Sequence, residues 1–247
     1  MKVQLQHHGK SCQIDLTHSL DISIAIRKSG NVNCYFLDDP SFAYFESPQF
    51  SGNLSAGGSV NCEKIALYPH ASGTHTECAL HVANVDFDMR HIQIPALQLC
   101  KLITVKPQLA GDDKIIDIKA LGIDSNPEHL EAIVVRTLPN EADKLHKNYS
   151  DTNPIFFDPD ALTHLKDLGF KHILTDLPSI DKESDEGRLS ARKNWFLING
   201  IAPKDRTITE LIFVEKQIKD GIYGLSMQVP SLQTDAVPSR ILLYPCE

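Results

Sequence analysis

Alternating apolar and polar residues indicate β-strands along much of this chain. Residues 2–6 and 12–16 alternate on either side of Gly9 and Lys10, which predicts a β-hairpin. Further strands are expected where β-branched residues are concentrated. They are residues 33–37, 63–68, 100–106, 132–138, 171–176, 207–214, 221–229 and 240–243.

Helical patterns separate some of these strands. The clearest covers residues 160–168, where Asp158 is placed to cap the helix, Pro159 suits its first turn and Gly169 ends it. A second helix is expected over residues 186–197. Mixed elements of this kind predict an α/β or α+β fold with a substantial mixed sheet.

Residues 38–59 are predicted to form a loop with interleaved aromatic residues. Two interpretations are open: the loop covers a functional site, or its aromatic side chains pin it to the core. No linker-like stretch divides the 247 residues, so we expect a single domain over residues 1–247.

Composition narrows the classes of partner. A net charge of −8 and a pI near 5.7 argue against nucleic acid and anionic membranes, which attract clustered Lys and Arg. No window approaches the ~20 apolar residues of a membrane helix, and the first residues lack the apolar core of a secretion signal. The six cysteines show no paired spacing and suit a reduced compartment, so a cytoplasmic location is expected.

A dense cluster of histidines and one acid lies between Pro69 and Val82. Imidazole nitrogen and carboxylate oxygen together are ligands that Zn²⁺, Mn²⁺ or Fe²⁺ accept. In an extended chain His75, Glu77 and His81 share one face, and Gly73 would allow a tight turn that brings in His70. A single histidine here would be an ordinary surface or hydrogen-bonded residue, but four groups at matching positions indicate a metal site.

The order of motifs gives a more specific indication. The segments that carry it are 57–62, 69–81, 172–181, 207–211, 220–223 and 235–240, and the central one reads Pro-His-Ala-Ser-Gly-Thr-His-Thr-Glu-Cys-Ala-Leu-His. Together they resemble the putative cyclase family of metal-dependent hydrolases, which includes bacterial kynurenine formamidase and isatin hydrolase. The usual family signature is His-x-Gly-Thr-His-x-Asp-x-x-x-His.

This resemblance implies a swivelling β/β/α-type fold with a barrel-like sheet, and subunits that pair as homodimers or larger assemblies. It places His70, His75 and Glu77 as ligands of a first metal ion. His81 takes the position of a second-metal ligand or of a catalytic base. Glu210 matches an acidic ligand of the second metal.

The sequence departs from the family signature at three positions. His70 lies one residue further from Gly-Thr-His than usual, so a bulge would be needed to aim its ring at the ion. Glu77 replaces the usual Asp, which mainly changes the reach of the carboxylate.

The third departure is Arg192, which stands where the family usually has a histidine that binds the second metal. An arginine stays protonated and has no lone pair to donate. Our hypothesis is that its guanidinium occupies the place of the second cation, pairs with Glu210 and leaves a mononuclear site. The alternative is that Arg192 is an ordinary solvated helix residue.

The chemistry that such a site supports is hydrolysis by metal-activated water. The resemblance implies a small amide substrate, either an aryl-formamide or a cyclic amide, and a divalent Zn or Mn ion. His81 would act as base, and Arg192 with Glu210 would stabilise an oxyanion or form a vestigial second site. Two other functions stay open: a catalytically altered binding module of the same fold, and a metal-dependent cyclase or lyase. No phosphate-binding glycine pattern is present, so a nucleotide cofactor is not expected.

Overall fold

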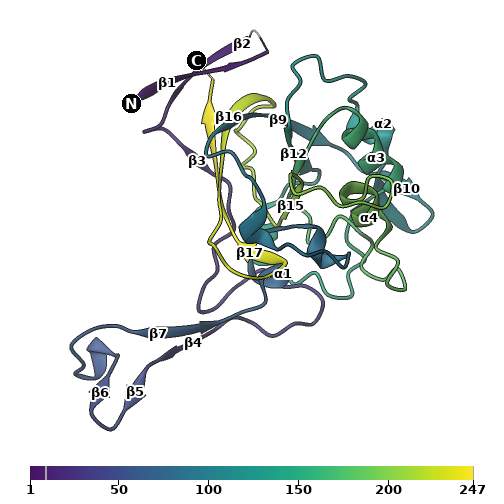
Figure 1. Cartoon of the computed structure of the whole chain (residues 1–247). Helices are drawn as coiled ribbons and strands as arrows, with labels where there is room; N and C mark the ends of the chain where they lie inside the picture. The colour runs from purple at the N-terminus through teal and green to yellow at the C-terminus, as the bar shows by residue number, and fades with distance from the viewer. Residues whose placement is uncertain (9, 247) are drawn as a thin grey trace.

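A curled, mixed sheet of nine strands forms the centre of the molecule in the computed structural model, which describes residues 1–8 and 10–246 (Figure 1). In spatial order its strands are β17 (Ala236–Pro238), β8 (His75–Glu77), β15 (Thr207–Glu210), β14 (His172–Thr175), β12 (Ala132–Thr137), β9 (Gln98–Val105), β16 (Gly221–Gln228), β18 (Arg240–Pro245) and β3 (Leu20–Asp21). Strands β15, β14, β12 and β9 are parallel to one another, and the outer strands pair antiparallel. The predicted mixed, barrel-like α/β sheet is confirmed.

The central strands are buried on both faces. In β12 the side chains of Ile133 and Val135 join the core cluster that contains the helices, while Ala132 and Val134 join a second cluster on the opposite face. Every residue of β12 is buried. This double burial is typical of parallel strands and explains why the strand has a nearly continuous apolar sequence.

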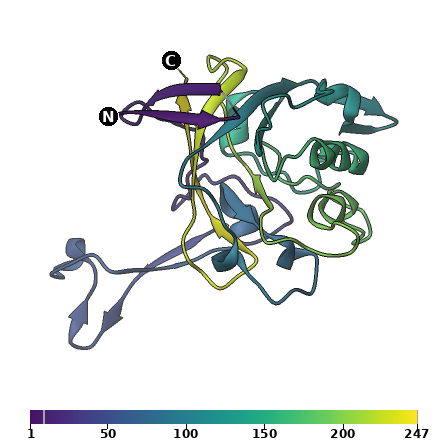
Figure 2. The same ribbon diagram turned by 45° about the horizontal axis from the view of Figure 1, so that its top comes forward.

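Helices α3 (Pro159–Asp167) and α4 (Ser190–Phe196) pack against each other beside the sheet (Figure 2). The predicted helix over residues 160–168 is confirmed, and the Asp158 side chain accepts a hydrogen bond from the backbone of Asp160. Helix α4 begins later than predicted because Gly187 and Leu189 adopt positive φ angles of 74° and 47°. The chain therefore cannot be helical before residue 190.

Most of the predicted strands are present, but two expectations are wrong. Residues 33–37 form no strand, because Tyr35 and Phe36 have φ angles of 60° and 56°, in the left-handed region. The strand predicted over residues 207–214 ends at Glu210, because Leu211 also has a positive φ of 56°. The remaining elements are α1 (Pro69–Ser72), α2 (Ile118–Leu121), β10 (Gln108–Ala110), β11 (Asp113–Ile116), β13 (Phe156–Phe157), η2 (Ala79–His81), η3 (Met89–His91) and η4 (Ala142–Leu145).

Residues 41–66 form an arm that projects from the body of the molecule in both views (Figures 1 and 2). Its stem is the antiparallel pair β4 (Ser41–Tyr44) and β7 (Glu63–Ala66). Its tip contains β5 (Glu46–Ser47), β6 (Phe50–Ser51) and η1 (Leu54–Ala56). The prediction of an irregular loop over residues 38–59 is wrong, and so is the idea that its aromatics pin it to the core, since Phe45 is 52% and Phe50 39% exposed.

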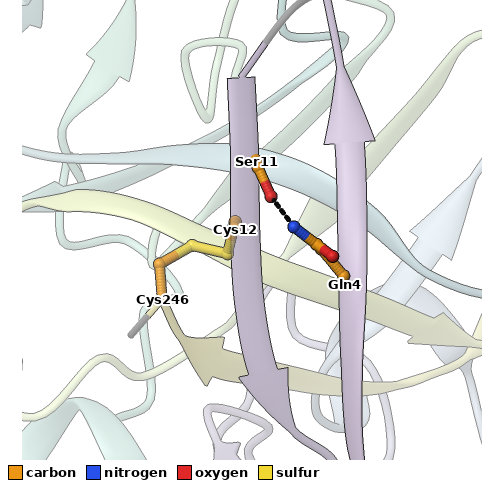
Figure 3. Close-up of a disulfide and its surroundings, with 4 residues drawn as sticks. All are labelled: Gln4, Ser11, Cys12 and Cys246. Carbon is orange, nitrogen blue, oxygen red and sulfur yellow. Dashed lines mark hydrogen bonds between the residues drawn. A yellow bond between two sulfur atoms is a disulfide. The ribbon is translucent and has the colours of Figure 1, made fainter.

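The predicted N-terminal hairpin is confirmed as β1 (Lys2–His7) and β2 (Lys10–Asp15), although Gly9 at its turn lies outside the described residues. A disulfide joins Cys12 of this hairpin to Cys246, with their Cα atoms 5.3 Å apart (Figure 3). The expectation that all cysteines are unpaired is therefore wrong for this pair. The other four cysteines, at 34, 62, 78 and 100, are free.

The expected cytoplasmic location loses the support that unpaired cysteines gave it and stays a prediction. Among the described helices, none combines the length and the apolar character needed to cross a bilayer.

Reduction of the disulfide should destabilise the protein markedly. The cross-link spans 234 residues, and chain-entropy arguments give a stabilisation on the order of 5 kcal/mol for a loop of this size. We expect the melting temperature to fall by roughly 10 °C or more in reductant and in a Cys12→Ser variant. Thermal unfolding with and without reductant measures this shift. A Cys62→Ser variant, which removes an exposed free thiol, is the control. Equal melting temperatures for oxidised and reduced protein would contradict the expectation.

Candidate metal centre

The predicted histidine and acid cluster spans three short elements at the edge of the sheet. His70 lies on helix α1, His75 and Glu77 lie on β8, and His81 ends the η2 turn. Strand β8 is held between β15 and β17, so its side chains are fixed on both sides. The alternation predicted for an extended chain holds for His75 and Glu77, but His81 arrives through a helical turn.

His70, His75 and Glu77 converge on a common point. Each offers one ligand atom, and these atoms all lie within 4.8 Å of one another. Nδ1 of His70 is 3.4 Å from Oε2 of Glu77. Nδ1 of His75 lies 3.1 Å from the carbonyl oxygen of Gly73, which accepts its proton and leaves Nε2 with the lone pair.

Two atoms of this group have unused hydrogen-bonding capacity. Within the described part of the chain, Nε2 of His75 and Oε2 of Glu77 are buried and have no hydrogen-bond partner. Leaving a buried polar atom unpaired costs about 1–3 kcal/mol. Two such atoms beside Nδ1 of His70 fit the ligand set of a divalent cation, which would satisfy all three.

Gly73 makes this convergence possible. Its φ is 157°, and a Cβ added there would lie 2.8 Å from the carbonyl oxygen of Ile24. The predicted role of Gly73 in turning the chain is therefore consistent with its backbone. His70 lies on the single turn of α1 and not on the bulge that was expected to aim its ring.

Arg192 lies on the buried side of the site, which also contains Glu77, His75 and Glu210. Its side chain is 5% exposed. Its Nε donates to Oε1 of Glu77 at 2.7 Å, and its Nη2 donates to both carboxylate oxygens of Glu210 at 2.7 and 2.8 Å. Its Nη1 donates to Asp181 at 2.9 Å and to the hydroxyl of Ser179 at 2.7 Å. All five N–H groups are thus used. The expected pairing with Glu210 is present, and the alternative of a solvated helix residue is wrong.

The segment after β14 supplies two of these contacts. Ser179 and Asp181, both in the family-like segment 172–181, bind Arg192. Oδ1 of Asp181 also accepts from the backbone N–H of Ala191 at 2.8 Å, at the start of α4. Asp176 has a separate role and bonds to buried Lys144 at 2.8 Å.

Glu210 lies beside the metal cluster without joining it. Its Oε2 is 3.3 Å from Nε2 of His75, while its Oε1 accepts from the backbone N–H of Ile180 at 2.8 Å. Three carboxyl groups, those of Glu77, Asp181 and Glu210, surround the single positive charge of Arg192, so acidic groups are in excess. Such an excess in a buried site attracts a further cation.

The more exposed side of the site contains Asp235, which was not predicted from the sequence as a site residue. Oδ2 of Asp235 lies 2.9 Å from Nε2 of His70 and 2.8 Å from Nδ1 of His81. His81 therefore groups with His70 and Asp235 and not with His75 and Glu77. In the sequence, Asp235 was noted only as the first residue of the family-like segment 235–240. It lies more than 150 positions from both histidines.

These contacts set the charges of the site. Burial works to lower the pKa of His70, but its hydrogen bond to Asp235 and the nearby carboxylate of Glu77 outweigh burial and raise the pKa to about 9. Burial would raise the pKa of Glu77, yet the charge of Arg192 and the nearby imidazole of His70 hold the pKa below its usual range. The bonds from His70 and His81 likewise lower the pKa of Asp235. Both carboxylates are therefore anionic near neutral pH.

A protein-family comparison agrees with the motif order. The family model described as "Putative cyclase" matches residues 14–182, which include α1, β8 and η2. The chain belongs to the putative cyclase family. Among curated proteins, none matches the sequence.

Solved structures share this cyclase-family fold at low sequence identity. One, "Potential Metal-Dependent Hydrolase With Cyclase Activity", is 19% identical, with a TM-score of 0.63, over 93% of this chain and 98% of that chain. A predicted metal-dependent hydrolase from Bacillus stearothermophilus is 18% identical, with a TM-score of 0.60, over 92% and 98%. Isatin hydrolase A from Labrenzia aggregata, bound to benzyl benzoate, is 13% identical, with a TM-score of 0.64, over 93% and 94%.

Replacing Arg192 with methionine should destabilise the fold. The substitution keeps a long side chain but leaves Glu77, Asp181 and Glu210 without their counter-charge, so we expect the free energy of unfolding to fall by about 3–5 kcal/mol. Urea denaturation measures the change. The matched control is Arg188→Met, which removes a guanidinium that is 67% exposed and should cost less than about 1 kcal/mol. Equal losses of unfolding free energy in the two variants would contradict a stabilising role for the buried contacts of Arg192.

Proposed function

We propose that this chain is a metal-dependent hydrolase that cleaves a small amide with an activated water molecule. The observation that supports it most directly is the pair of unpartnered buried atoms, Nε2 of His75 and Oε2 of Glu77, facing Nδ1 of His70. Membership of the cyclase family and the metal-dependent hydrolases among proteins of this fold point in the same direction.

The donor set fits the proposed ion. Two neutral imidazoles and one carboxylate suit Zn²⁺, and they also suit Mn²⁺. His70, His75 and Glu77 would hold the ion, and His70 would lose its proton on binding. When bound, such an ion lowers the pKa of a water molecule towards neutrality and polarises a carbonyl group.

His81 is the proposed base. Its Nδ1 faces Asp235, so Nε2 is the nitrogen left to accept a proton from the attacking water. Its side chain is 28% exposed, which leaves room for a substrate to approach. As the carbon–nitrogen bond breaks, the same imidazole gives the proton to the leaving nitrogen.

Arg192 supports a site for a single ion. The guanidinium binds Glu77 and Glu210, where the family usually has a histidine for the second metal. Since all five N–H groups of Arg192 already have acceptors, the residue has no donor left for a substrate oxyanion. Of the two roles left open by the sequence, this favours a vestigial second site. Glu210 then acts as the partner of Arg192 and not as a ligand.

The choice of substrate class is supported only by the family resemblance. We propose that the substrate is an aryl-formamide or a cyclic amide. Isatin hydrolase A, a protein of similar fold, is a hydrolase by its name. A metal-free binding module is less favoured, because it would leave two buried acceptors unsatisfied. Ring closure or a lyase step would use the same ligands and is distinguished by its products.

Metal content and turnover test the proposal together. We expect one tightly bound Zn²⁺ or Mn²⁺ per chain, and hydrolysis of N-formylkynurenine, isatin or a related amide. His75→Ala should lose both the ion and the activity. His81→Ala should keep the ion and lose about 10²–10⁴-fold in kcat. Elemental analysis and product identification by mass spectrometry provide the measurements.

Three results would each overturn part of this scheme. Protein that binds neither ion after supplementation would favour the binding module. Two tightly bound ions would contradict the mononuclear site. Retained activity in His81→Ala would remove that residue from the mechanism.

The projecting arm supports the homodimer implied by the family resemblance. Six of the fourteen large apolar side chains that are exposed in the described residues fall between residues 45 and 68. They are Phe45, Phe50, Leu54, Val60, Ile65 and Tyr68. Residues 41–68 contain only Glu46, Glu63 and Lys64 as charged residues, so two copies could meet there with little repulsion despite the net charge of −8. We propose that a second copy of this chain covers the arm and the adjoining Tyr68.

A charged residue on the arm should therefore weaken the dimer. Ile65 is 54% exposed in this chain, and Ile65→Asp would bury a charge at the proposed interface. Light scattering should show a shift from dimer towards monomer at equal concentration. Leu109→Asp, at a 78% exposed residue outside the arm, is the control and should stay dimeric. Wild-type protein that is monomeric at high concentration would refute the dimer.

A further inference from the structure

Asp235 is shared by the two histidines that the sequence assigned to different roles. A single oxygen, Oδ2, lies 2.9 Å from Nε2 of His70 and 2.8 Å from Nδ1 of His81. The two imidazole rings lie side by side, with centroids 4.2 Å apart and planes inclined by 32°. One carboxylate thus contacts both a proposed metal ligand and the proposed base.

The backbone fixes Asp235 in this place. The residue directly precedes β17, which pairs with β8 so that Ala236 lies opposite Glu77. Its carbonyl oxygen accepts the backbone N–H of Cys78 at 3.0 Å, at the end of the same ladder. The other carboxylate oxygen, Oδ1, accepts the hydroxyl of Thr234 at 3.0 Å. Both oxygens are therefore held, and the carboxylate cannot turn freely.

We propose that Asp235 is a positioning residue that fixes the tautomers of His70 and His81 at the same time. A neutral imidazole carries one N–H, and an anionic carboxylate can only accept. Once His70 has lost a proton to metal binding, Oδ2 selects Nε2–H on His70, and it selects Nδ1–H on His81. The lone pairs are left on Nδ1 of His70, which faces Oε2 of Glu77 at 3.4 Å, and on Nε2 of His81.

Each half of this arrangement has a known physical effect. A carboxylate behind a metal-binding histidine orients the ring and raises its basicity, and its loss typically costs 10–100-fold in metal affinity or activity. A carboxylate behind a catalytic histidine holds the reactive tautomer and stabilises the imidazolium that forms on proton transfer. Asp235 would supply both effects from one atom. It can do so only if the proposed metal-dependent hydrolysis is the activity of this chain.

A different role for Asp235 is that of a metal ligand. His70, His81 and Asp235 also lie close enough together to hold an ion. However, Oδ2 of Asp235 lies at ordinary hydrogen-bond lengths from the nitrogens of both histidines. The side chains of all three residues are 22–30% exposed. The unpartnered buried acceptors lie instead on His75 and Glu77. The geometry therefore favours hydrogen bonding by Asp235 over coordination.

Asp235→Asn tests the inference, because the amide has nearly the same shape but offers a single acceptor oxygen and adds two donors. Zn²⁺ is used as the probe for binding, since it is diamagnetic and permits NMR of the loaded protein. We expect Zn²⁺ to bind 10–100-fold more weakly, as is typical for loss of such a carboxylate. With saturating Zn²⁺, kcat for the best amide substrate should fall by about 10²-fold or more while KM changes little.

The spectroscopic signature separates positioning from a general structural effect. Long-range ¹H–¹⁵N spectra of the zinc-loaded wild-type protein should show His81 protonated at Nδ1, and Asp235→Asn should lose this preference. Asp88→Asn is the matched control, since Asp88 also contacts a histidine, with Nδ1 of His91 at 3.2 Å, but contacts neither His70 nor His81. It should keep the zinc affinity, kcat and the His81 tautomer of the wild type.

The outcomes separate this inference from the proposed function. Wild-type protein that binds no Zn²⁺ and hydrolyses no amide contradicts the proposed function itself. Wild-type protein that does both, with an Asp235→Asn variant of unchanged zinc affinity, kcat and tautomer, overturns the positioning role alone. Two zinc ions in the wild type and one in the variant would also overturn it, because Asp235 would then be a ligand.

Discussion

The buried guanidinium of Arg192 is the interaction on which the rest of the site depends. It connects β8 through Glu77, β15 through Glu210 and the segment after β14 through Asp181. Asp181 in turn accepts the backbone N–H groups of Ala191 and Arg192 in the first turn of α4, the helix that carries Arg192. Helix and sheet are thereby locked in one relative position. The cost of burying these charges is offset only while all of them stay together, which makes the arrangement cooperative.

This network divides the site into a dry side and a wet side. On the dry side, Glu77, His75 and Glu210 are at most 1% exposed and bind Arg192 or lie beside it. On the wet side, His70, His81 and Asp235 are 22–30% exposed and bind one another. Glu77 joins the two sides, because one of its oxygens accepts from Arg192 and the other faces His70. A cation bound there would be anchored by the dry side, while proton transfer would occur where water and substrate have access.

Local patterns predicted the parts of this structure that local physics determines. Helix α3 and the parallel strands follow from capping residues and apolar runs, and the convergence of His75 with Glu77 follows from the two-residue period of a strand. The burial of Arg192 followed from a departure from a family pattern. The positions of His81 and Asp235 could not be read in this way. One depends on a helical turn after β8, and the other on the pairing of β8 with a strand more than 150 residues away.

The pairing of Cys12 with Cys246 and the conformation of residues 33–37 were not predicted, for a similar reason. Cysteine spacing along a sequence gives no information about a pair 234 residues apart. The positive φ angles of Tyr35 and Phe36 are adopted against the intrinsic preference of aromatic residues for extended conformations. Contacts between residues far apart in the sequence, and not local preferences, determine both the disulfide pair and these two backbone angles.

The link between Cys12 and Cys246 has a topological consequence. It makes residues 12–246 a closed covalent ring in which the arm is one outward loop. A single backbone cut at the arm tip, for example beside Gly57 and Gly58, would open this ring without releasing a fragment. The two resulting pieces would travel together until the disulfide was reduced, and the new ends would lie far from the body that holds the histidines.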